Sequence, residues 1–327
     1  MPMRYFVTGG AGFIGSNYVR GLLSGQWGNN VSGVTVFDSF TYAGNRHNLD
    51  ECSADSRLTI VNGDIRNPQD IVESLPGHDV VVHFAAESHV DRSIESSSVF
   101  MSTNVLGTHQ LLEAALKLKI ERFVHISTDE VYGSIDSGSW DENEPLLPNS
   151  PYAASKASSD LVARSYYRTH GLNLSITRCS NNFGKYQYPE KVIPLFITNL
   201  ITGKKVPLYG DGLNIRDWLH VDDHCRGIDL VVNGGRAGEI YNIGGGTEMN
   251  NKDLTFLLLE QCGFGEERVE WVEDRLGHDR RYSVNWNKIK NELGYSPQES
   301  IQSSIGDIVA WYKANPQWWE PLRNKTK

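Results

Sequence analysis

Short runs of apolar and β-branched residues recur through the first half of the chain, and stretches with helical spacing separate them. Such runs are typical of buried strands. They lie at residues 5–7, 34–37, 58–61, 80–84 and 123–126. The spacing predicts helices at 13–23, 68–75 and 99–118. Because alternating strands and helices build right-handed βαβ units, we expect a parallel sheet covered by helices.

A helix over 151–170 and a strand over 174–177 complete this pattern, and beyond residue 180 the rhythm becomes less regular. Helices are still predicted there, at 192–202, 221–233, 251–261 and 301–315. The predicted fold class is α/β. Residues 1–180 form a Rossmann-like, doubly wound parallel sheet, and residues 181–327 form a smaller mixed α/β domain that binds the substrate, with chain crossings allowed between the two.

Composition narrows the class of protein. Hydrophobic residues make up 39% of the chain, which suits a folded protein with a core. The net charge of -9 argues against a nucleic-acid or anionic-membrane surface. Neither a run of about 18 apolar residues nor a leader peptide is recognisable. The four cysteines show no metal-binding spacing, so we expect free thiols, no metal and a cytoplasmic location.

A glycine-rich segment follows the first predicted strand. Gly9, Gly12 and Gly15 open the next helix, where missing side chains and a helix N-terminus suit a pyrophosphate. Asp38 ends the second strand and is placed to bind an adenosine ribose. Because its charge would repel a 2′-phosphate, we predict NAD rather than NADP. The pair Asp64 and Ile65, past the third strand, is expected at the adenine edge.

Tyr152 and Lys156 lie four residues apart at the start of a predicted helix, so they share one face. A nearby ammonium, helped by a positive nicotinamide, would lower the pKa of the phenol and make it a usable base. Such a pair also arises by chance. The upstream glycines, and Ser127 with Thr128 at the end of the fifth strand, favour the catalytic interpretation because ligands bind at the carboxyl ends of parallel strands.

Several segments resemble the extended short-chain dehydrogenases and, within them, the dTDP-glucose 4,6-dehydratases. The segments are TGGAGFIG (8–15), AAESHVDRS (85–93), STDEVYG (127–133), PYAASKA (151–157), TRCSNN (177–182), RDWLHVDDH (216–224) and GHDRRY (277–282). The discriminating part is Thr128-Asp129-Glu130. Relatives that catalyse 4-epimerisation lack the acid and base, and decarboxylases typically carry Thr-Ser-Glu there.

Two adjacent carboxyl groups at a strand end are often only solvated loop residues. In this context they become an acid and a base: a ketone at C4 acidifies the neighbouring C–H, Glu130 removes that proton, and Asp129, kept protonated by burial and by its anionic neighbour, protonates the departing hydroxyl. The resemblance implies that Tyr152 takes the 4-hydroxyl proton as NAD⁺ is reduced, and that the hydrogen returns to C6. Thr128 would bond the 4-oxygen.

The resemblance and the motifs together give a set of expected site residues. The catalytic residues are Thr128, Asp129, Glu130, Tyr152 and Lys156. The NAD-binding residues are Gly9, Gly12, Phe13, Ile14, Gly15, Asp38, Asp64, Ile65, Phe84, Ala85, Ala86, Ser88, Thr103, Tyr152 and Lys156. The residues expected to bind the nucleotide sugar are Ser88, Thr128, Asn181, Glu190, Lys191, Val192, Pro207, Tyr209, Arg216, Asn251, His278 and Tyr282. The family also implies a homodimer through 99–118 and 152–169.

Two other interpretations remain open at this point. One is a 4-epimerase or decarboxylase acting on a UDP-sugar. The other is an NAD-binding regulator that keeps the fold without catalysis, against which the complete set of five catalytic residues argues.

Overall fold

The computed structural model describes residues 2–28, 30–274 and 276–324. Its centre is a sheet of seven strands, all paired in parallel, in the order β10-β6-β5-β4-β1-β2-β3. The strands are β1 (Met3–Thr8), β2 (Val31–Asp38), β3 (Leu58–Asn62), β4 (Val80–His83), β5 (Arg122–Thr128), β6 (Leu174–Cys179) and β10 (Ile240–Ile243). The predicted parallel sheet is confirmed, and the order of β1 to β6 is that of a dinucleotide-binding fold.

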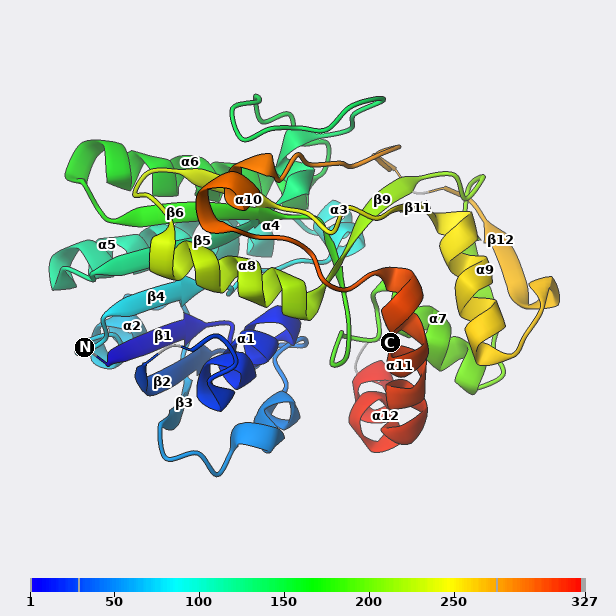
Figure 1. Cartoon of the computed structure of the whole chain (residues 1–327), viewed down its shortest axis with the longest axis horizontal. Helices are drawn as coiled ribbons and strands as arrows, with labels where there is room; N and C mark the ends of the chain where they lie inside the picture. The colour runs from blue at the N-terminus through cyan, green and yellow to red at the C-terminus, as the bar shows by residue number, and fades with distance from the viewer. Residues whose placement is uncertain (1, 29, 275, 325–327) are drawn as a thin grey trace.

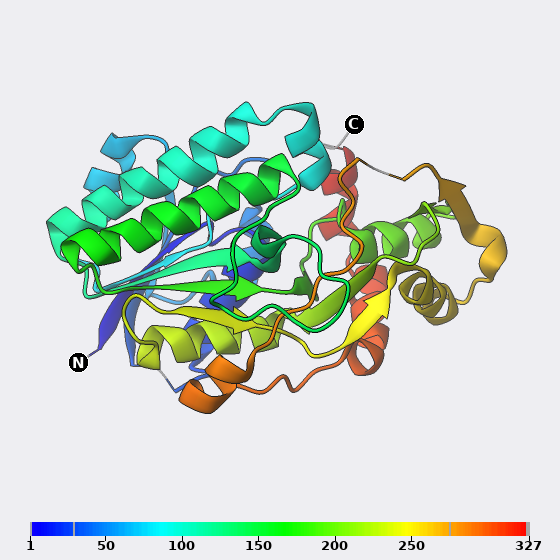
Figure 2. The ribbon, with the colours of Figure 1, turned by 90° about the horizontal axis from the view of Figure 1, so that it is seen from above.

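Helices cover both faces of this sheet (Figures 1 and 2). One face carries α2 (Pro68–Ser74), α5 (Thr108–Leu118) and α6 (Pro151–His170), and the other carries α1 (Phe13–Ser24), α8 (Val221–Gly234) and α10 (Asn287–Leu293). Each layer has its own apolar core. Strands buried on both faces read as continuous apolar runs, which is why the sequence reveals them.

The segment predicted as one helix over 99–118 contains a change of helix type. It consists of α4 (Ser98–Phe100), a π-helical turn η2 (Met101–Gly107) and α5. Within the turn, the carbonyl of Asn104 accepts a hydrogen bond from the Thr108 hydroxyl at 2.7 Å. Helical periodicity does not distinguish such a turn from a regular helix, and π-turns are frequent at functional sites.

Helix α6 has the predicted bounds because local chemistry fixes both ends. The hydroxyl of Ser150 accepts a hydrogen bond from the Ala153 N–H, and Pro151 occupies the first turn. Gly171 ends the helix with a positive φ of 69°. These are the usual start and stop signals of a helix. Tyr152 and Lys156 are therefore held in its first two turns.

The remaining elements form a smaller lobe around a separate apolar core. They are β7 (Asn181–Phe183), α7 (Val192–Ile201), β8 (Val206–Tyr209), β9 (Ile215–His220), β11 (Glu248–Asn250), α9 (Asn251–Cys262), β12 (Val269–Val272), α11 (Ile301–Ala314) and α12 (Pro316–Asn324). The four helices predicted in this half are confirmed. Between them the chain returns to the large sheet through α8, β10 and α10 (Figure 1). A single division at residue 180 stays a prediction.

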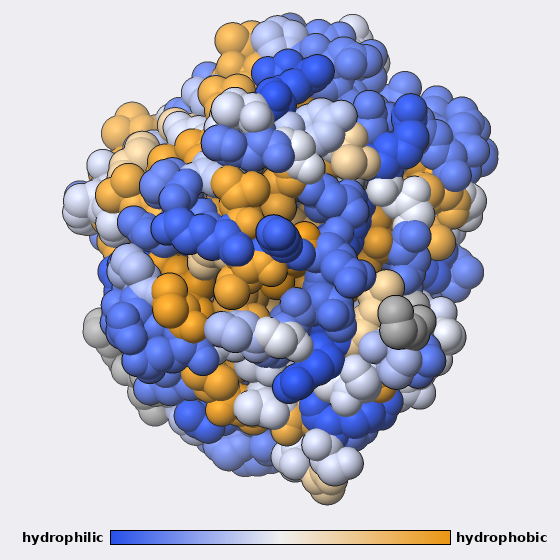
Figure 3. All heavy atoms as spheres, turned by 90° about the vertical axis from the view of Figure 1, so that its left-hand side faces the viewer, coloured by the Kyte–Doolittle hydropathy of each residue, from blue (hydrophilic) through white to orange (hydrophobic). Residues whose placement is uncertain are grey.

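The surface is mixed in polarity. Figure 3 turns the left-hand side of Figure 1 to the viewer and shows mostly hydrophilic residues with separate hydrophobic patches, as folded proteins usually have. Among the described residues, no helix combines the length and the apolar character needed to cross a bilayer.

Candidate active site

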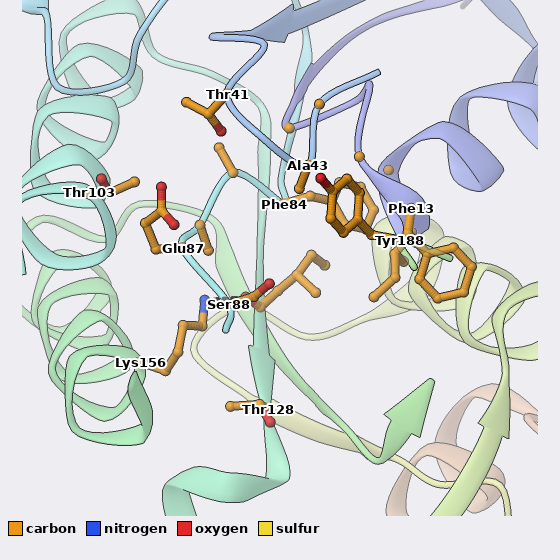
Figure 4. A pocket seen from close by; sticks show the side chains of 18 of the residues that line it. Phe13, Thr41, Ala43, Phe84, Glu87, Ser88, Thr103, Thr128, Lys156 and Tyr188 are labelled. Atoms are coloured by element: carbon orange, nitrogen blue, oxygen red, sulfur yellow. Dashed lines mark hydrogen bonds between the residues drawn. The ribbon is translucent and has the colours of Figure 1, made fainter. Parts of the chain in front are cut away.

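A cavity of about 310 Å³ opens at the carboxyl ends of β1, β2, β4 and β5. All residues predicted to bind NAD line it, from the glycine segment to Lys156. Figure 4 shows Lys156 and Thr103 reaching in from helices on one side, with Phe13 and Tyr188 across from them. The cavity lies where the chain changes direction between β1 and β4, which is where doubly wound sheets bind ligands.

The glycine segment forms a close-packed cradle. A Cβ atom on Gly9 would lie 2.6 Å from the Ala85 nitrogen, and one on Gly15 would lie 2.3 Å from the Gly9 carbonyl oxygen. Gly9 also has a positive φ of 66°. No side chain caps the start of α1 at Gly12, so the helix N-terminus faces the cavity without a competing acid. These features fit a dinucleotide pyrophosphate.

Asp38 ends β2 at the cavity wall. Its carboxylate accepts hydrogen bonds from the backbone N–H of Ala11 at 3.0 Å and of Phe40 at 2.9 Å. Burial raises the pKa of this carboxyl, and the two N–H groups oppose the rise. The guanidinium of Arg46 lies over the Phe40 ring. An acid held beside the glycine loop suits the ribose of NAD.

Tyr152 and Lys156 both line the cavity from α6. The ammonium of Lys156 donates to the Ile126 carbonyl at 2.7 Å, and burial lowers its pKa to about 8. Burial and the negative charge of Glu130 raise the pKa of Tyr152 well above its ordinary value, and hydrogen bonding with Thr128 opposes this. The expected lowering of the phenol pKa is therefore not produced by the protein's own groups, because desolvation outweighs them.

Thr128, Asp129 and Glu130 lie where β5 ends and the short helix η3 (Asp129–Tyr132) begins. The Thr128 hydroxyl donates to Asp129 Oδ1 at 3.3 Å and accepts from the Glu130 N–H. Within the described part of the chain, Asp129 Oδ2 is buried without a hydrogen-bond partner. Burial first, then the charges of Glu130 and Asp217, raise the pKa of Asp129 well above its ordinary value.

A second buried carboxyl group, Asp160, lies one helical turn beyond Lys156. Its Oδ2 is 2.9 Å from Arg178 Nε, and its Oδ1 is 3.3 Å from His125 Nε2. Burial alone would raise its pKa, but Arg178, His125 and Lys156 outweigh burial and lower it to about 2. Asp160 in turn raises the pKa of Lys156, against the effect of desolvation.

A second cavity of about 570 Å³ adjoins the first on the side of the small lobe. It contains most of the residues predicted for the nucleotide sugar: Ser88, Asn181, Glu190, Lys191, Val192, Pro207, Tyr209, Arg216, Asn251 and His278. Ser88, Glu130, Asn181, Asn182, Gln187, Glu190 and Lys191 line both cavities. The two spaces meet at Glu130, next to Asp129 and Thr128 of the first cavity.

Tyr282 is the one predicted substrate residue that lines neither cavity. It is buried, and its hydroxyl donates to Asp279 Oδ2 at 2.5 Å. The guanidinium of Arg216 lies 4.3 Å from the centre of its ring and donates to the carbonyls of Ile215 and Asp279. In this arrangement Tyr282 supports Arg216 from behind, while Arg216 faces the cavity.

Sequence reasoning missed Asn104, which lines neither cavity but joins two elements of the site, and several residues of the cavity walls. Asn104 in the π-turn accepts from the Glu87 N–H at 2.8 Å, and its Nδ2 donates to the Glu87 carbonyl and to the Ser155 hydroxyl. It thus joins the loop after β4 to α6. The missed wall residues are Ser39, Thr41, Ala43, Gly44, Arg66, Gln187, Tyr188, Lys204 and Arg323. In the structure a Cβ on Gly44 would lie 2.5 Å from Asp38 Oδ1, a close approach that the sequence marks only by the presence of a glycine.

Comparison with known proteins shows to which family the chain belongs. Residues 6–308 match the sequence profile of the GDP-mannose 4,6 dehydratase family. The chain belongs to this family. The dTDP-glucose 4,6-dehydratase of an Actinoplanes species is 56% identical over 319 residues, covering 97% of this chain and all of the relative. The Escherichia coli dTDP-glucose 4,6-dehydratase is 45% identical over 350 residues, covering 98% of this chain and 96% of the relative.

Solved structures of this dehydratase family and of its epimerase relatives agree with the fold. The dTDP-glucose 4,6-dehydratase DesIV of Streptomyces venezuelae, solved with NAD and dTDP bound, is 60% identical with a TM-score of 0.97, covering 98% of this chain and all of that one. The UDP-glucose 4-epimerase of Thermotoga maritima is 29% identical with a TM-score of 0.88, covering 96% of this chain and all of that one. The fold is thus shared, while the identity favours the dehydratases.

Proposed function

We propose that this chain is a dTDP-glucose 4,6-dehydratase, which oxidises the sugar at C4, eliminates water across C5 and C6, and reduces C6 to give dTDP-4-keto-6-deoxyglucose. The observation that carries this is the pair Asp129 and Glu130 at the end of β5. Asp129 is buried, and one of its oxygens has no hydrogen-bond partner among the residues that the structure describes, whereas Glu130 lines the junction of the two cavities. The identity to several dehydratases supports the same reaction.

The cavity at the strand ends would hold NAD, with the glycine cradle at the pyrophosphate and Asp38 at the ribose. When bound, NAD⁺ supplies the redox chemistry, taking up hydrogen from C4 and giving it back at C6, and its positive ring lowers the pKa of the Tyr152 phenol. Tyr152 then accepts the proton of the 4-hydroxyl. Lys156 remains mostly protonated at neutral pH, since its pKa is about 8, and adds positive charge to the cavity that Tyr152 also lines.

The water loss needs an acid and a base. Asp129 is held in its protonated form by burial and by its negative neighbours, so it donates a proton to the hydroxyl that leaves C6. Glu130 accepts the C5 proton, which the C4 ketone has made acidic, and a proton that exchanges with solvent returns to C5 as C6 is reduced. The Thr128 hydroxyl binds the 4-oxygen and, through Asp129 Oδ1, fixes the orientation of the acid.

The second cavity receives the nucleoside diphosphate. Arg216 presents a planar guanidinium suited to a diphosphate, with its orientation fixed by Tyr282 and two backbone carbonyls. Pro207 and Tyr209 offer flat faces to the base. Lys191, whose ammonium donates to the Ser88 carbonyl at 2.9 Å, lies between the two cavities.

The test is incubation with dTDP-glucose in deuterated water, following the 4-keto product by its absorbance in alkali and deuterium at C5 by mass spectrometry. A 6-deoxy-4-keto sugar supports the proposal, and a 4-epimer without water loss rejects it. The double variant Asp129→Asn with Glu130→Gln should still reduce bound NAD⁺ but lose no water. The exposed adjacent pair Glu266 and Glu267, changed to glutamine, provides the matched control.

We also propose a homodimer formed through α5, α6 and the π-turn. Large apolar side chains are exposed on these elements, among them Leu106 and Leu161, at 60% and 57%. Light scattering on Leu106→Arg with Leu161→Glu should report a monomer.

The free state of all four cysteines suits the reducing cytoplasm, where we place the enzyme.

A further inference from the structure

Asn48 is a buried side chain that joins the cofactor loop to the last helix of the chain. It lies in the short helix η1 (Arg46–Cys52) and is 2% exposed. Its Nδ2 donates to the carbonyl of Ala11, within the glycine-rich segment, at 2.8 Å. Its Oδ1 accepts from the indole Nε1 of Trp318, on α12, at 2.8 Å. One amide thus bridges two segments that belong to different lobes.

At the cofactor end, the bridge acts on a peptide group that is already restrained. The Ala11 N–H donates to Asp38 Oδ2, and the Ala11 carbonyl accepts from the Asn45 N–H as well as from Asn48. Hydrogen bonds therefore restrain both the N–H and the carbonyl group of Ala11. The shape of the loop that receives the pyrophosphate depends on this residue, because it stands between Gly9 and Gly12.

At the other end, Trp318 is seated in an aromatic cluster of the small lobe. Its ring packs against Trp311 and Tyr186, with centroids 5.1 and 5.7 Å apart. Tyr186 also reaches the cofactor lobe, where its hydroxyl donates to Glu51 at 2.6 Å and its ring lies 4.2 Å from the Arg20 guanidinium. The indole N–H that meets Asn48 therefore comes from a well-packed helix rather than from a loose terminus.

We propose that Asn48 is a positioning residue that makes retention of the dinucleotide depend on the seating of α12. Slow release of the dinucleotide would serve the proposed reaction, because the same NAD must stay bound from C4 oxidation to C6 reduction. The inference rests on the proposed function only for this purpose. Thermodynamic linkage makes this coupling reciprocal. If the packing of α12 orders the loop that binds the dinucleotide, then binding of the dinucleotide also stabilises the packing of α12.

The test compares two neighbouring tryptophans of α12. Trp318→Phe removes the indole N–H that bonds Asn48. Trp319→Phe is the matched control, because Trp319 is also buried but its N–H donates to the Tyr312 carbonyl within the small lobe. A third variant, Asn48→Asp, keeps an acceptor for Trp318 but loses the donor to Ala11. Each holoenzyme is loaded with labelled NAD and chased with unlabelled NAD, without sugar, and the release rate is measured.

We expect about fivefold faster release from Trp318→Phe and Asn48→Asp, the usual effect of losing one buried hydrogen bond, and an unchanged rate from Trp319→Phe. Equal rates for the two tryptophan variants would overturn the proposal, as would faster release from Asn48→Asp alone. Hydrogen exchange on the wild type adds a measurement without variants: NAD should slow exchange in α12, and no change there contradicts the coupling. A failed dehydration assay would leave these results intact, so the two proposals fail separately.

Discussion

Asp129 and Asp160 are both almost fully buried, at 2% and 1% exposed, yet the structure drives their pKa values in opposite directions. Asp160 lies against the Arg178 guanidinium and stays ionised. Asp129 has negative neighbours, and Arg216 offsets only part of its cost of burial. Burial beside anions therefore favours a proton donor, whereas burial beside a cation gives a permanent anion that supports Lys156.

The largest effect should follow from removing the proton donor. Asp129→Asn keeps the size of the side chain but cannot transfer a proton, so we expect water loss to slow by about 10² to 10⁴ fold. Bound NAD⁺ should still be reduced by the sugar, which stopped-flow absorbance records. If water loss continues at the normal rate, Asp129 is not the acid.

Arg178→Met tests the other side of the comparison. The variant would leave the buried Asp160 without the Arg178 guanidinium. We therefore expect the free energy of unfolding in urea to be about 3–5 kcal/mol lower than in the wild type. Arg280 forms an exposed pair with Asp211, and Arg280→Met should leave stability nearly unchanged. Similar losses in both variants would mean that burial does not distinguish the two pairs.

The pH dependence of stability separates the aspartates by sign. The folded pKa of Asp129 is raised, so ionisation in the unfolded chain costs the wild type stability as pH rises above about 4. Asp129→Asn should therefore gain stability relative to the wild type as pH rises above about 4, and the gain should vanish below about pH 4. Urea titrations across this range measure it, and a gain that grows toward acid pH contradicts the assignment.

A smaller effect is expected on Lys156. Asp160 raises the pKa of this ammonium, which is about 8, so Asp160→Asn should move the alkaline limb of C4 oxidation to lower pH. We expect roughly threefold slower NAD⁺ reduction at about pH 8. The matched control is Asp223→Asn, since Asp223 is also buried and paired, with Arg226, but lies at the start of α8. A shift in both variants would indicate general destabilisation.

The sequence predicts most of the large sheet, because its strands are apolar on both faces and two of the helices between them, α2 and α6, begin at clear capping residues. It does not predict β7 to β12, which are three to six residues long and need partners from distant segments. The π-turn is hidden for a related reason, since its spacing resembles that of an ordinary helix. β10 joins the large sheet only because β6 offers an edge, which no local pattern records.

For the site, motifs predict which residues gather, and the neighbouring Glu130 also predicts a protonated Asp129, which the raised pKa of Asp129 confirms. They do not predict the charge of Asp160. What keeps Asp160 ionised is mainly Arg178, which β6 brings to α6, together with His125 and Lys156. In the chain without NAD, burial raises the pKa of Tyr152, a contribution that the sequence does not reveal, and the predicted lowering beside a nicotinamide stays a prediction. The bridge from Ala11 through Asn48 to Trp318 spans 270 residues between its last two members and carries no local signal.

The most direct test of the comparison is the protonation of Asp129 near neutral pH, by infrared difference spectroscopy between the wild type and its variants. We predict that the carbonyl band of a protonated carboxylic acid is lost in Asp129→Asn and is retained in Asp160→Asn. A difference spectrum for Asp129→Asn that contains only carboxylate bands would contradict the assignment of Asp129 as the acid.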